Sequence, residues 1–148
     1  MKDSRLLEIL REVAAFRKLI FTDRDIELPL SINKTQRGVL MYIAFNGPVS
    51  MNEVSERFSL EKGSFTQVAD SLENLYLIER KRCEKDRRKI YLEITEKGKE
   101  IARKIQLATE TRIESLLSSL PKKDRDLFLN SLETVAGYID VIRREKDC

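Results

Sequence analysis

The spacing of apolar residues predicts a mostly α-helical protein with one small antiparallel β-hairpin. Over five segments the apolar positions recur every three or four residues, which is the period of an amphipathic helix. These segments are 4–22, 34–45, 61–75, 95–120 and 121–144. A shorter helix is expected directly after Ser50. Near residue 78 the period changes to two, which predicts strands at 78–83 and 90–94.

Residues that favour helix ends mark the expected boundaries of three helices. Asn33 is a suitable N-cap for the second helix. Gly47 and Pro48 should end that helix, because glycine can adopt the left-handed conformation and proline cannot continue a helix. Thr95 is a suitable N-cap for the helix that runs to about 120, and Pro121 is expected at the first position of the last helix.

Residues 50–75 carry the sequence features of a helix-turn-helix. Ser50 and Glu53 form a capping-box sequence, in which the Ser50 side chain accepts from the Glu53 backbone and Glu53 reaches back. The apolar face of the helix at 61–75 consists of Phe65, Val68, Ala69, Leu72 and Leu75. Its opposite face carries Lys62, Ser64, Thr66, Gln67, Asp70, Ser71 and Asn74. Two short helices joined by a tight turn, the second with such a polar face, are what a DNA-recognition helix-turn-helix requires.

Positive charge is concentrated in the loop that joins the two predicted strands. The whole chain has a net charge of only +3, from 28 basic and 25 acidic residues. Residues 80–89 alone contain seven basic and two acidic residues. A basic hairpin directly after a helix-turn-helix indicates a wing whose tip contacts phosphates. The alternative is a solvated run of charge that keeps an edge hairpin soluble.

The polar face of the helix at 61–75 supplies the first candidate contacts to double-stranded DNA. Gln67 can pair bidentately with adenine, and Ser64 and Thr66 can bond to phosphate or to a base. Lys62 can contact phosphate, and Ser71 lies on the same face. The alternative is an ordinary solvated helix face.

The predicted wing supplies the second group of contacts. Arg87 and Arg88 are candidates for the minor groove, where the focused negative potential attracts arginine, and Lys85 for the phosphate backbone. Asp86 looks out of place in an anion-binding tip. It makes sense if its carboxylate orients Arg88 through a charge-assisted bond.

The N-terminus of the short helix is a third candidate. The backbone N–H groups of Met51 and Asn52 lie at the positive end of a helix dipole and could hold a phosphate. Capping for stability alone explains the same residues equally well.

Composition excludes several other classes of protein. Apolar residues make up 41% and charged residues 36%, which argues against disorder. With two Cys and no His, neither a disulfide framework nor an ordinary zinc site is expected. No phosphate-binding glycine loop or nucleophile motif is present, so neither an enzyme nor a cofactor is expected. The absence of a long apolar run or signal peptide favours a cytoplasmic protein without a membrane partner.

The wing sequence resembles a known signature. Residues 86–98 resemble the D-x-R, five residues, L-T-x-x-G pattern of MarR-type regulators, with Ile94 in place of leucine. Residues 61–67 resemble that family's D-K-S-T-V-T-R helix start, and 68–80 resemble L-V-D-R-L-E-K-K-G-L-V-E-R. The resemblance covers nearly the whole chain in element order and is specific from 50 to 98.

This resemblance implies a homodimeric transcriptional regulator, with repression the expected action, that binds a pseudo-palindromic operator. It implies one MarR-like domain over 1–148. A winged helix-turn-helix lobe is expected at about 32–98, flanked by long dimerisation helices in about 1–25 and 99–148. Arg88 matches the family's minor-groove arginine, and Asp86 the aspartate that steadies it. Many members release DNA when a small, often phenolic, effector binds between the dimerisation region and the lobe.

The chain departs from the family pattern at several positions. Gln67 stands where arginine is frequent, which favours an adenine contact over a guanine contact. Gly63 replaces a common serine and loosens the first turn. Tyr76 replaces the usual glycine, and because a bulky residue with positive φ is costly, that helix end is expected to be built differently. Cys83 and Cys148 do not match the reactive cysteine of peroxide-sensing members, so redox sensing is not expected.

Two other functions fit the same architecture. One is a winged-helix protein-interaction module that has lost DNA binding, against which the basic wing argues. The other is a dimer whose task is to capture or sequester a small ligand.

Overall fold

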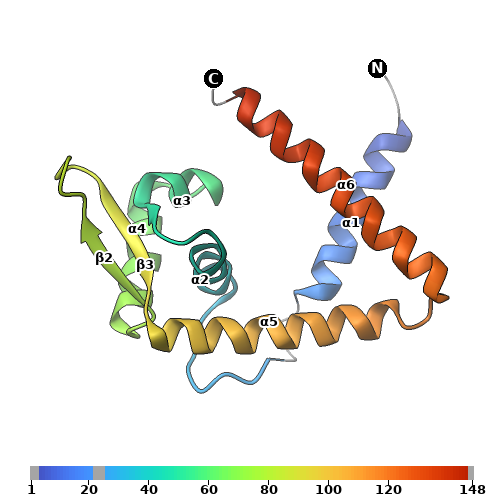
Figure 1. The fold of residues 1–148 in the computed structure, drawn as a ribbon, viewed down its shortest axis with the longest axis horizontal. Coiled ribbons are helices and arrows are strands. Elements are labelled where there is room, and N and C mark those ends of the chain that lie inside the picture. Colours follow the sequence, from blue (N-terminus) through green and yellow to red (C-terminus); the bar gives the residue numbers. More distant parts are fainter. Residues whose placement is uncertain (1–3, 22–25, 147–148) are drawn as a thin grey trace. The chain divides into compact units, whose positions relative to one another are not determined.

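A computed structural model describes residues 4–21 and 26–146 and confirms the predicted fold class, mostly helical with a small antiparallel sheet (Figure 1). The chain forms two compact units, Met1–Thr109 and Glu110–Cys148. The elements, in chain order, are α1 (Ser4–Ile20), α2 (Lys34–Asn46), β1 (Val49–Ser50), α3 (Met51–Arg57), α4 (Lys62–Asn74), β2 (Ile78–Arg82), β3 (Ile90–Ile94), α5 (Glu96–Leu117) and α6 (Lys122–Lys146). Residue 22, the predicted end of the first helix, and Cys148 lie outside the described residues.

The sheet has three antiparallel strands in the order β1-β3-β2. The hairpin of β2 and β3 was predicted, but β1 was not, because two residues are too few to show a period. Leu92 in the central strand faces Val49 of β1 on one side and Arg80 of β2 on the other. Both Leu92 and Val49 are buried, so the extra strand closes one edge of the core.

The core of the first unit lies between α2, α4, the sheet and the start of α5. Its buried side chains include Val39, Leu40, Ile43, Val54, Phe65, Ala69, Leu72, Leu77, Ile78, Leu92, Ile101 and Ile105. The predicted apolar face of α4 is therefore confirmed, with Phe65, Ala69 and Leu72 buried and Val68 and Leu75 half-buried. Each large apolar side chain buried here stabilises the fold by about 1.5–3 kcal/mol. This burial fixes which side of α4 faces outward.

The predicted ends of α2 and α3 form, with one difference. Asn33 caps α2, and Gly47 ends it with a φ of 69°. The Ser50 hydroxyl accepts the Glu53 N–H at 3.1 Å, as predicted. The reciprocal bond predicted from the Ser50 N–H to the Glu53 side chain does not form. The Glu53 carboxylate instead accepts a hydrogen bond from the Tyr42 hydroxyl at 2.9 Å. Ser50 also belongs to β1, so its backbone serves the sheet as well as the helix.

The expectation for Tyr76 is wrong, because this residue itself adopts a positive φ of 60°. The Tyr76 N–H donates to Glu73 O at 2.9 Å and the Leu77 N–H to Leu72 O at 3.0 Å. These two bonds form a Schellman ending, which glycine usually provides. The left-handed conformation costs about 1–2 kcal/mol for an L-residue. Burial of Leu77 and the placement of the Lys97 ammonium over the Tyr76 ring, at 5.9 Å, offset that cost.

The start of α5 is packed against this same turn. Thr95 caps the helix as predicted, since its hydroxyl accepts the Gly98 N–H at 3.0 Å. The same hydroxyl donates to Tyr76 O at 2.6 Å, and the Thr95 N–H donates to Leu77 O at 3.1 Å. A Cβ on Gly98 would lie 2.1 Å from Leu77 O. The T-x-x-G part of the wing signature is therefore a close packing of α5 on the end of α4.

The junction of α5 and α6 differs slightly from the prediction. The helix α5 ends at Leu117 rather than near 120. The Pro121 carbonyl accepts the N–H groups of Asp124 and Arg125, both at 3.0 Å. Pro121 therefore precedes α6 instead of occupying its first position.

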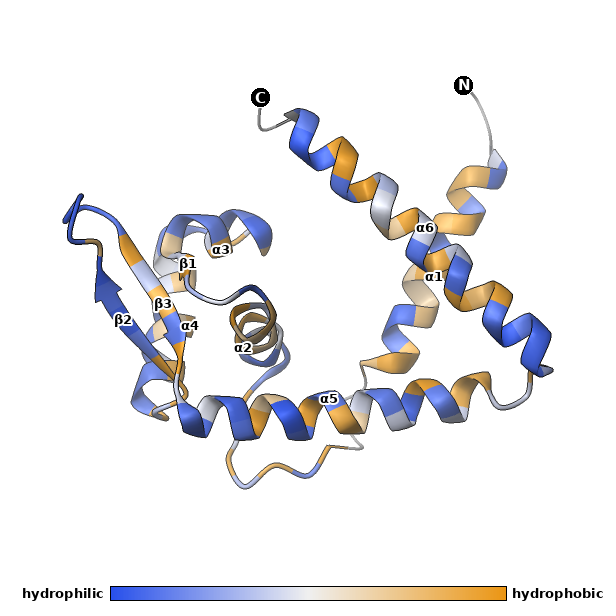
Figure 2. Ribbon diagram, in the orientation of Figure 1, coloured by the Kyte–Doolittle hydropathy of each residue, from blue (hydrophilic) through white to orange (hydrophobic). Residues whose placement is uncertain are grey.

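The outer helices α1 and α6 expose many large apolar side chains. Figure 2 shows apolar residues (orange) recurring along both helices. On α1 these include Leu6, Leu7, Ile9, Leu10, Val13 and Leu19, and on α6 Leu127, Leu129, Leu132, Val135, Tyr138, Ile139, Val141 and Ile142. None of the helices in the described parts of the chain combines the length and apolar character that crossing a membrane requires.

Candidate nucleic-acid interface

Helix α4 presents its polar side chains outward, as the sequence predicted. Phe65 and Ala69 are buried on the opposite face and anchor the helix in the core. Of the predicted contacts on α4, Ser71 is half-buried, and the exposed ones are Lys62, Ser64, Thr66 and Gln67. The arrangement of α4 is therefore suited to entering a groove.

The N-terminal turn of α4 has no side-chain cap. Glu61 occupies the N-cap position, but its side chain makes no capping hydrogen bond. Gly63, in the first turn, has open space around the position of a Cβ. The Phe65 N–H nevertheless donates to Glu61 O at 2.9 Å, and the loosening of this turn by Gly63 stays a prediction.

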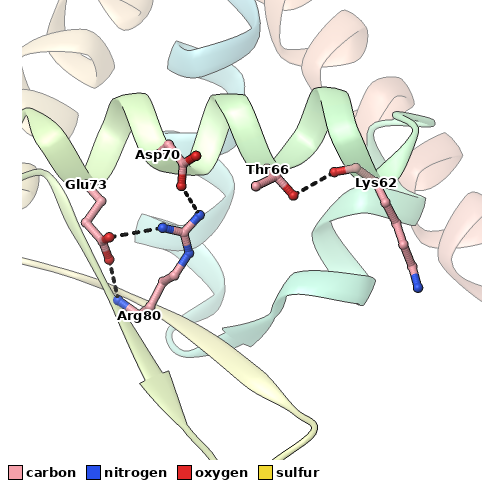
Figure 3. Close-up of polar contacts among 5 residues, drawn as sticks. All are labelled: Lys62, Thr66, Asp70, Glu73 and Arg80. Atoms are coloured by element: carbon pink, nitrogen blue, oxygen red, sulfur yellow. Dashed lines mark hydrogen bonds and ion pairs between the residues drawn. The ribbon is translucent and has the colours of Figure 1, made fainter.

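Thr66 has a restricted hydrogen-bonding role in this conformation. Its hydroxyl donates to Lys62 O at 2.7 Å, so its only proton is engaged within the helix (Figure 3). The oxygen lone pairs and the methyl group remain for a ligand. A phosphate offers only acceptors, whereas adenine and cytosine offer an amino group in the major groove. In this conformation Thr66 can contact a base and cannot donate to phosphate.

Arg80 joins the wing strand to α4, an arrangement that the sequence analysis missed. Its Nη1 lies 3.0 Å from Glu73 Oε1 and its Nη2 lies 2.5 Å from Asp70 Oδ1 (Figure 3). The Arg80 backbone N–H also donates to Glu73 Oε2 at 3.1 Å. Burial lowers the pKa of Arg80, but the hydrogen bond and charge of Asp70, together with Glu73, outweigh it and raise that pKa. The Asp70 carboxylate is therefore engaged in an ion pair within the protein.

The remaining positive charge lies at the wing tip. Lys81 is paired with Glu93 across the hairpin, and that hydrogen bond raises the pKa of Lys81. The other basic residues of the wing are exposed and make no ion pair within residues 4–21 and 26–146. They are Arg82, Lys85, Arg87, Arg88 and Lys89. Because Arg80 and Lys81 are paired with carboxylates, the unpaired positive charge of the wing is concentrated towards its tip.

Asp86 bonds Arg88 as predicted, through the backbone of Arg88. Its carboxylate accepts the backbone N–H of Arg88 at 3.0 Å and does not hold the guanidinium. The Asp86 carbonyl accepts the Lys89 N–H at 3.0 Å, and the Cys83 N–H donates to Lys89 O at 3.0 Å. An aspartate side chain readily accepts a hydrogen bond from the backbone N–H two residues further along the chain, so this local contact forms in preference to one with the guanidinium. Asp86 shapes the turn that displays Arg87 and Arg88.

The third predicted group lies at the start of α3. Met51 is half-buried and packs on the core, while Asn52 is exposed. Phosphate binding by their backbone N–H groups stays a prediction.

Other kinds of site are few in the described ranges. No group of three His, Cys, Asp or Glu side chains within 4–21 and 26–146 could hold a metal ion. The second unit contains an open, mainly apolar hollow of about 300 Å³ between α5 and α6. Its lining residues include Ile113, Leu117, Lys122, Arg125 and Leu129.

Comparison with known proteins agrees with this geometry. The MarR family model matches residues 30–89. The chain is 32% identical over 94 residues to YkoM, named as an uncharacterised HTH-type transcriptional regulator of Bacillus subtilis, and the match covers 64% of this chain and 61% of YkoM. It is 29% identical over 104 residues to MhqR, an HTH-type transcriptional regulator of the same organism, and this match covers 70% of this chain and 72% of MhqR.

The fold has a close counterpart among solved structures. A MarR transcriptional regulator from Methanosarcina mazei superposes with a TM-score of 0.75 at 24% identity, over 94% of this chain and 99% of that one. Together with the D-x-R and T-x-x-G wing residues and the family match, this likeness leads to one conclusion. Residues 30–89 match the MarR family model, and the chain has the fold of a MarR-type winged-helix protein.

Proposed function

We propose that this protein is a homodimeric transcriptional regulator, acting as a repressor, that binds a pseudo-palindromic stretch of double-stranded DNA. The observation that carries this proposal is the far end of the wing, where Arg82 and the four cations of the tip are exposed and have no carboxylate partner in the described residues. A cationic tip on the same unit as an outward polar helix suits an ordered polyanion. Two relatives are named as transcriptional regulators, which supports the same function.

In the proposed complex, α4 enters the major groove and the wing tip enters the neighbouring minor groove. Gln67 pairs with an adenine edge, and Thr66 offers its oxygen to a base amino group or its methyl to thymine. Arg87 and Arg88 insert at the minor groove. The phosphate contacts come from Lys62, Ser64, Ser71, Lys85 and the backbone N–H groups of Met51 and Asn52.

The dimer would form through the exposed apolar faces of the outer helices, since large exposed apolar patches mark interaction sites. Two copies related by two-fold symmetry would match two half-sites about one helical turn apart. Family resemblance also supports a small aromatic effector that weakens operator binding. A ligand can do so only through different affinities for the DNA-bound and free conformations.

The test is a selection of duplexes from a randomised library, followed by fluorescence anisotropy with the selected duplex. Affinity should fall steeply as the salt concentration rises. Arg88→Ala should weaken binding about tenfold and reduce the slope of log affinity against log salt concentration by about one. Lys104→Ala removes the same charge from α5 and should have little effect. Absence of binding even to random duplex at low salt would overturn the proposal and favour a protein-interaction role.

A further inference from the structure

The contacts of Arg80 span two parts of the proposed interface. Asp70 and Glu73 lie one turn apart on α4, beside Arg80 (Figure 3). Arg80 is the middle residue of β2 and pairs with Leu92 of β3. One side chain and its backbone N–H make three hydrogen bonds to these two carboxylates. A planar guanidinium fork fixes direction as well as distance, which a lysine ammonium does not.

Arg80 is also the outermost anchored position of the wing. In β2, Ile78 is buried and Arg80 is half-buried, whereas Lys81 and Arg82 beyond it are exposed. The tip residues 84–89 are all exposed as well. Anchoring of β2 to α4 by side chains therefore stops at Arg80, and the segment that carries the cationic tip begins there.

We propose that Arg80 is a positioning residue that holds the wing tip at a fixed offset from the outward face of α4. One duplex can then receive Gln67 and Arg88 in the same encounter. An isolated exposed ion pair contributes little to stability, so the directional contacts matter more than the charge attraction. This inference rests on the proposed function and assigns to Arg80 a role in DNA affinity without contact to DNA.

A competing explanation is that Arg80 merely neutralises two carboxylates that would repel phosphate. Arg80→Met and the triple variant Arg80→Met, Asp70→Asn, Glu73→Gln separate the two explanations. Both variants lack the fork, but only Arg80→Met leaves the acidic charges unpaired. Positioning predicts that both bind the selected duplex about tenfold more weakly than wild type. Recovery of wild-type affinity in the triple variant would overturn the proposal.

A second measurement reads the positioning directly. In the wild-type background Arg88→Ala should cost about tenfold, whereas in the Arg80→Met background it should cost only about twofold, because the tip no longer reaches the duplex correctly. Equal costs in the two backgrounds would overturn the proposal. Arg80→Lys keeps the charge, loses the fork and should still weaken binding several-fold, which covers the case in which Arg80→Met fails to fold.

Lys81→Met is the matched control. Lys81 is the next residue of the same strand, and its carboxylate partner Glu93 lies on β3 rather than α4. Its replacement should change affinity by about twofold at most and leave the Arg88→Ala cost unchanged. A cost as large as that of Arg80→Met would overturn the inference. If wild type binds no duplex, the proposed function fails; if wild type binds and Arg80→Met binds equally, only the inference fails.

Discussion

At the residue scale, Gly98 has the least room of the five glycines for an added side chain. A methyl group there would lie 2.1 Å from Leu77 O and 2.7 Å from an Ile94 side-chain carbon. We expect Gly98→Ala to lower the free energy of unfolding by about 2 kcal/mol or more, because α5 must shift away from the turn that Thr95 bonds. Urea denaturation measures this change.

Gly137 provides the matched control for that substitution. It lies within α6, and no neighbouring atom comes within 4 Å of the place that an added methyl group would occupy. Gly137→Ala should raise the free energy of unfolding of its helix by about 0.5–1 kcal/mol, because glycine is a poor helix former. The same chemical change is thus expected to have opposite signs at the two positions, and a loss at both would contradict the packing described for Gly98.

Asp86 permits a second test at this scale. Asp86→Asn keeps an oxygen that can accept the Arg88 N–H and removes a negative charge from the tip. We expect it to bind DNA as tightly as wild type or up to about threefold more tightly. Asp86→Ala loses the turn contact and should weaken binding. Equal weakening by both substitutions would mean that the carboxylate charge, and not only the acceptor oxygen, is needed at this turn.

At the element scale, the period of apolar residues was sufficient to predict five of the helices and both strands of the hairpin, whereas α3 was predicted from the capping sequence at Ser50 and Glu53. It could not reveal β1, whose two residues carry no period, or the early end of α5, because the apolar spacing continues through Leu120. Caps at Asn33 and Thr95 were predictable since their partners lie three residues away. The partners of Arg80 were not, because only the folded chain brings β2 beside α4.

The start of α4 gives a prediction at the same scale. Glu61 is an N-cap without a side-chain bond, and the shorter aspartate is among the preferred N-cap residues. Glu61→Asp should raise the free energy of unfolding by about 0.5–1 kcal/mol at constant charge. Glu100→Asp, at an exposed position inside α5, should lower it slightly, because aspartate is the weaker helix former. Thermal and urea unfolding of both variants test this, and a loss for Glu61→Asp would contradict it.

At the scale of the whole molecule, the absence of histidine predicts a flat dependence on pH near neutrality. The pKa values of Arg80 and Lys81 are raised by their carboxylate partners. The stability that these two cations contribute is therefore fully present at any pH below the usual pKa of each side chain. It is lost only as the pH rises through the raised values. The free energy of unfolding should therefore change little between about pH 6 and 8. A steep change in urea denaturation across that window would contradict this.

The exposed apolar faces give the final prediction. Ile139 on α6 is 48% exposed, so burying the rest of it in an interface is favourable by about 1 kcal/mol, roughly half the value for a fully exposed side chain. Ile139→Glu would place a charge there, so we expect sedimentation equilibrium to show a shift from dimer to monomer. Asn130→Glu adds the same group at an exposed polar position of the same helix and should leave the dimer intact.

The same pair of variants links assembly to DNA binding. A dimer binds its second half-site as an intramolecular step, so loss of the dimer should weaken binding to a two-half-site duplex by about a hundredfold. Binding to a single half-site should be almost unchanged, because α4 and the wing are untouched. If Ile139→Glu remained dimeric, the apolar face of α6 would not be the interface. If it became monomeric without losing affinity for the full duplex, each lobe would act independently and two-fold symmetry would have no part in recognition.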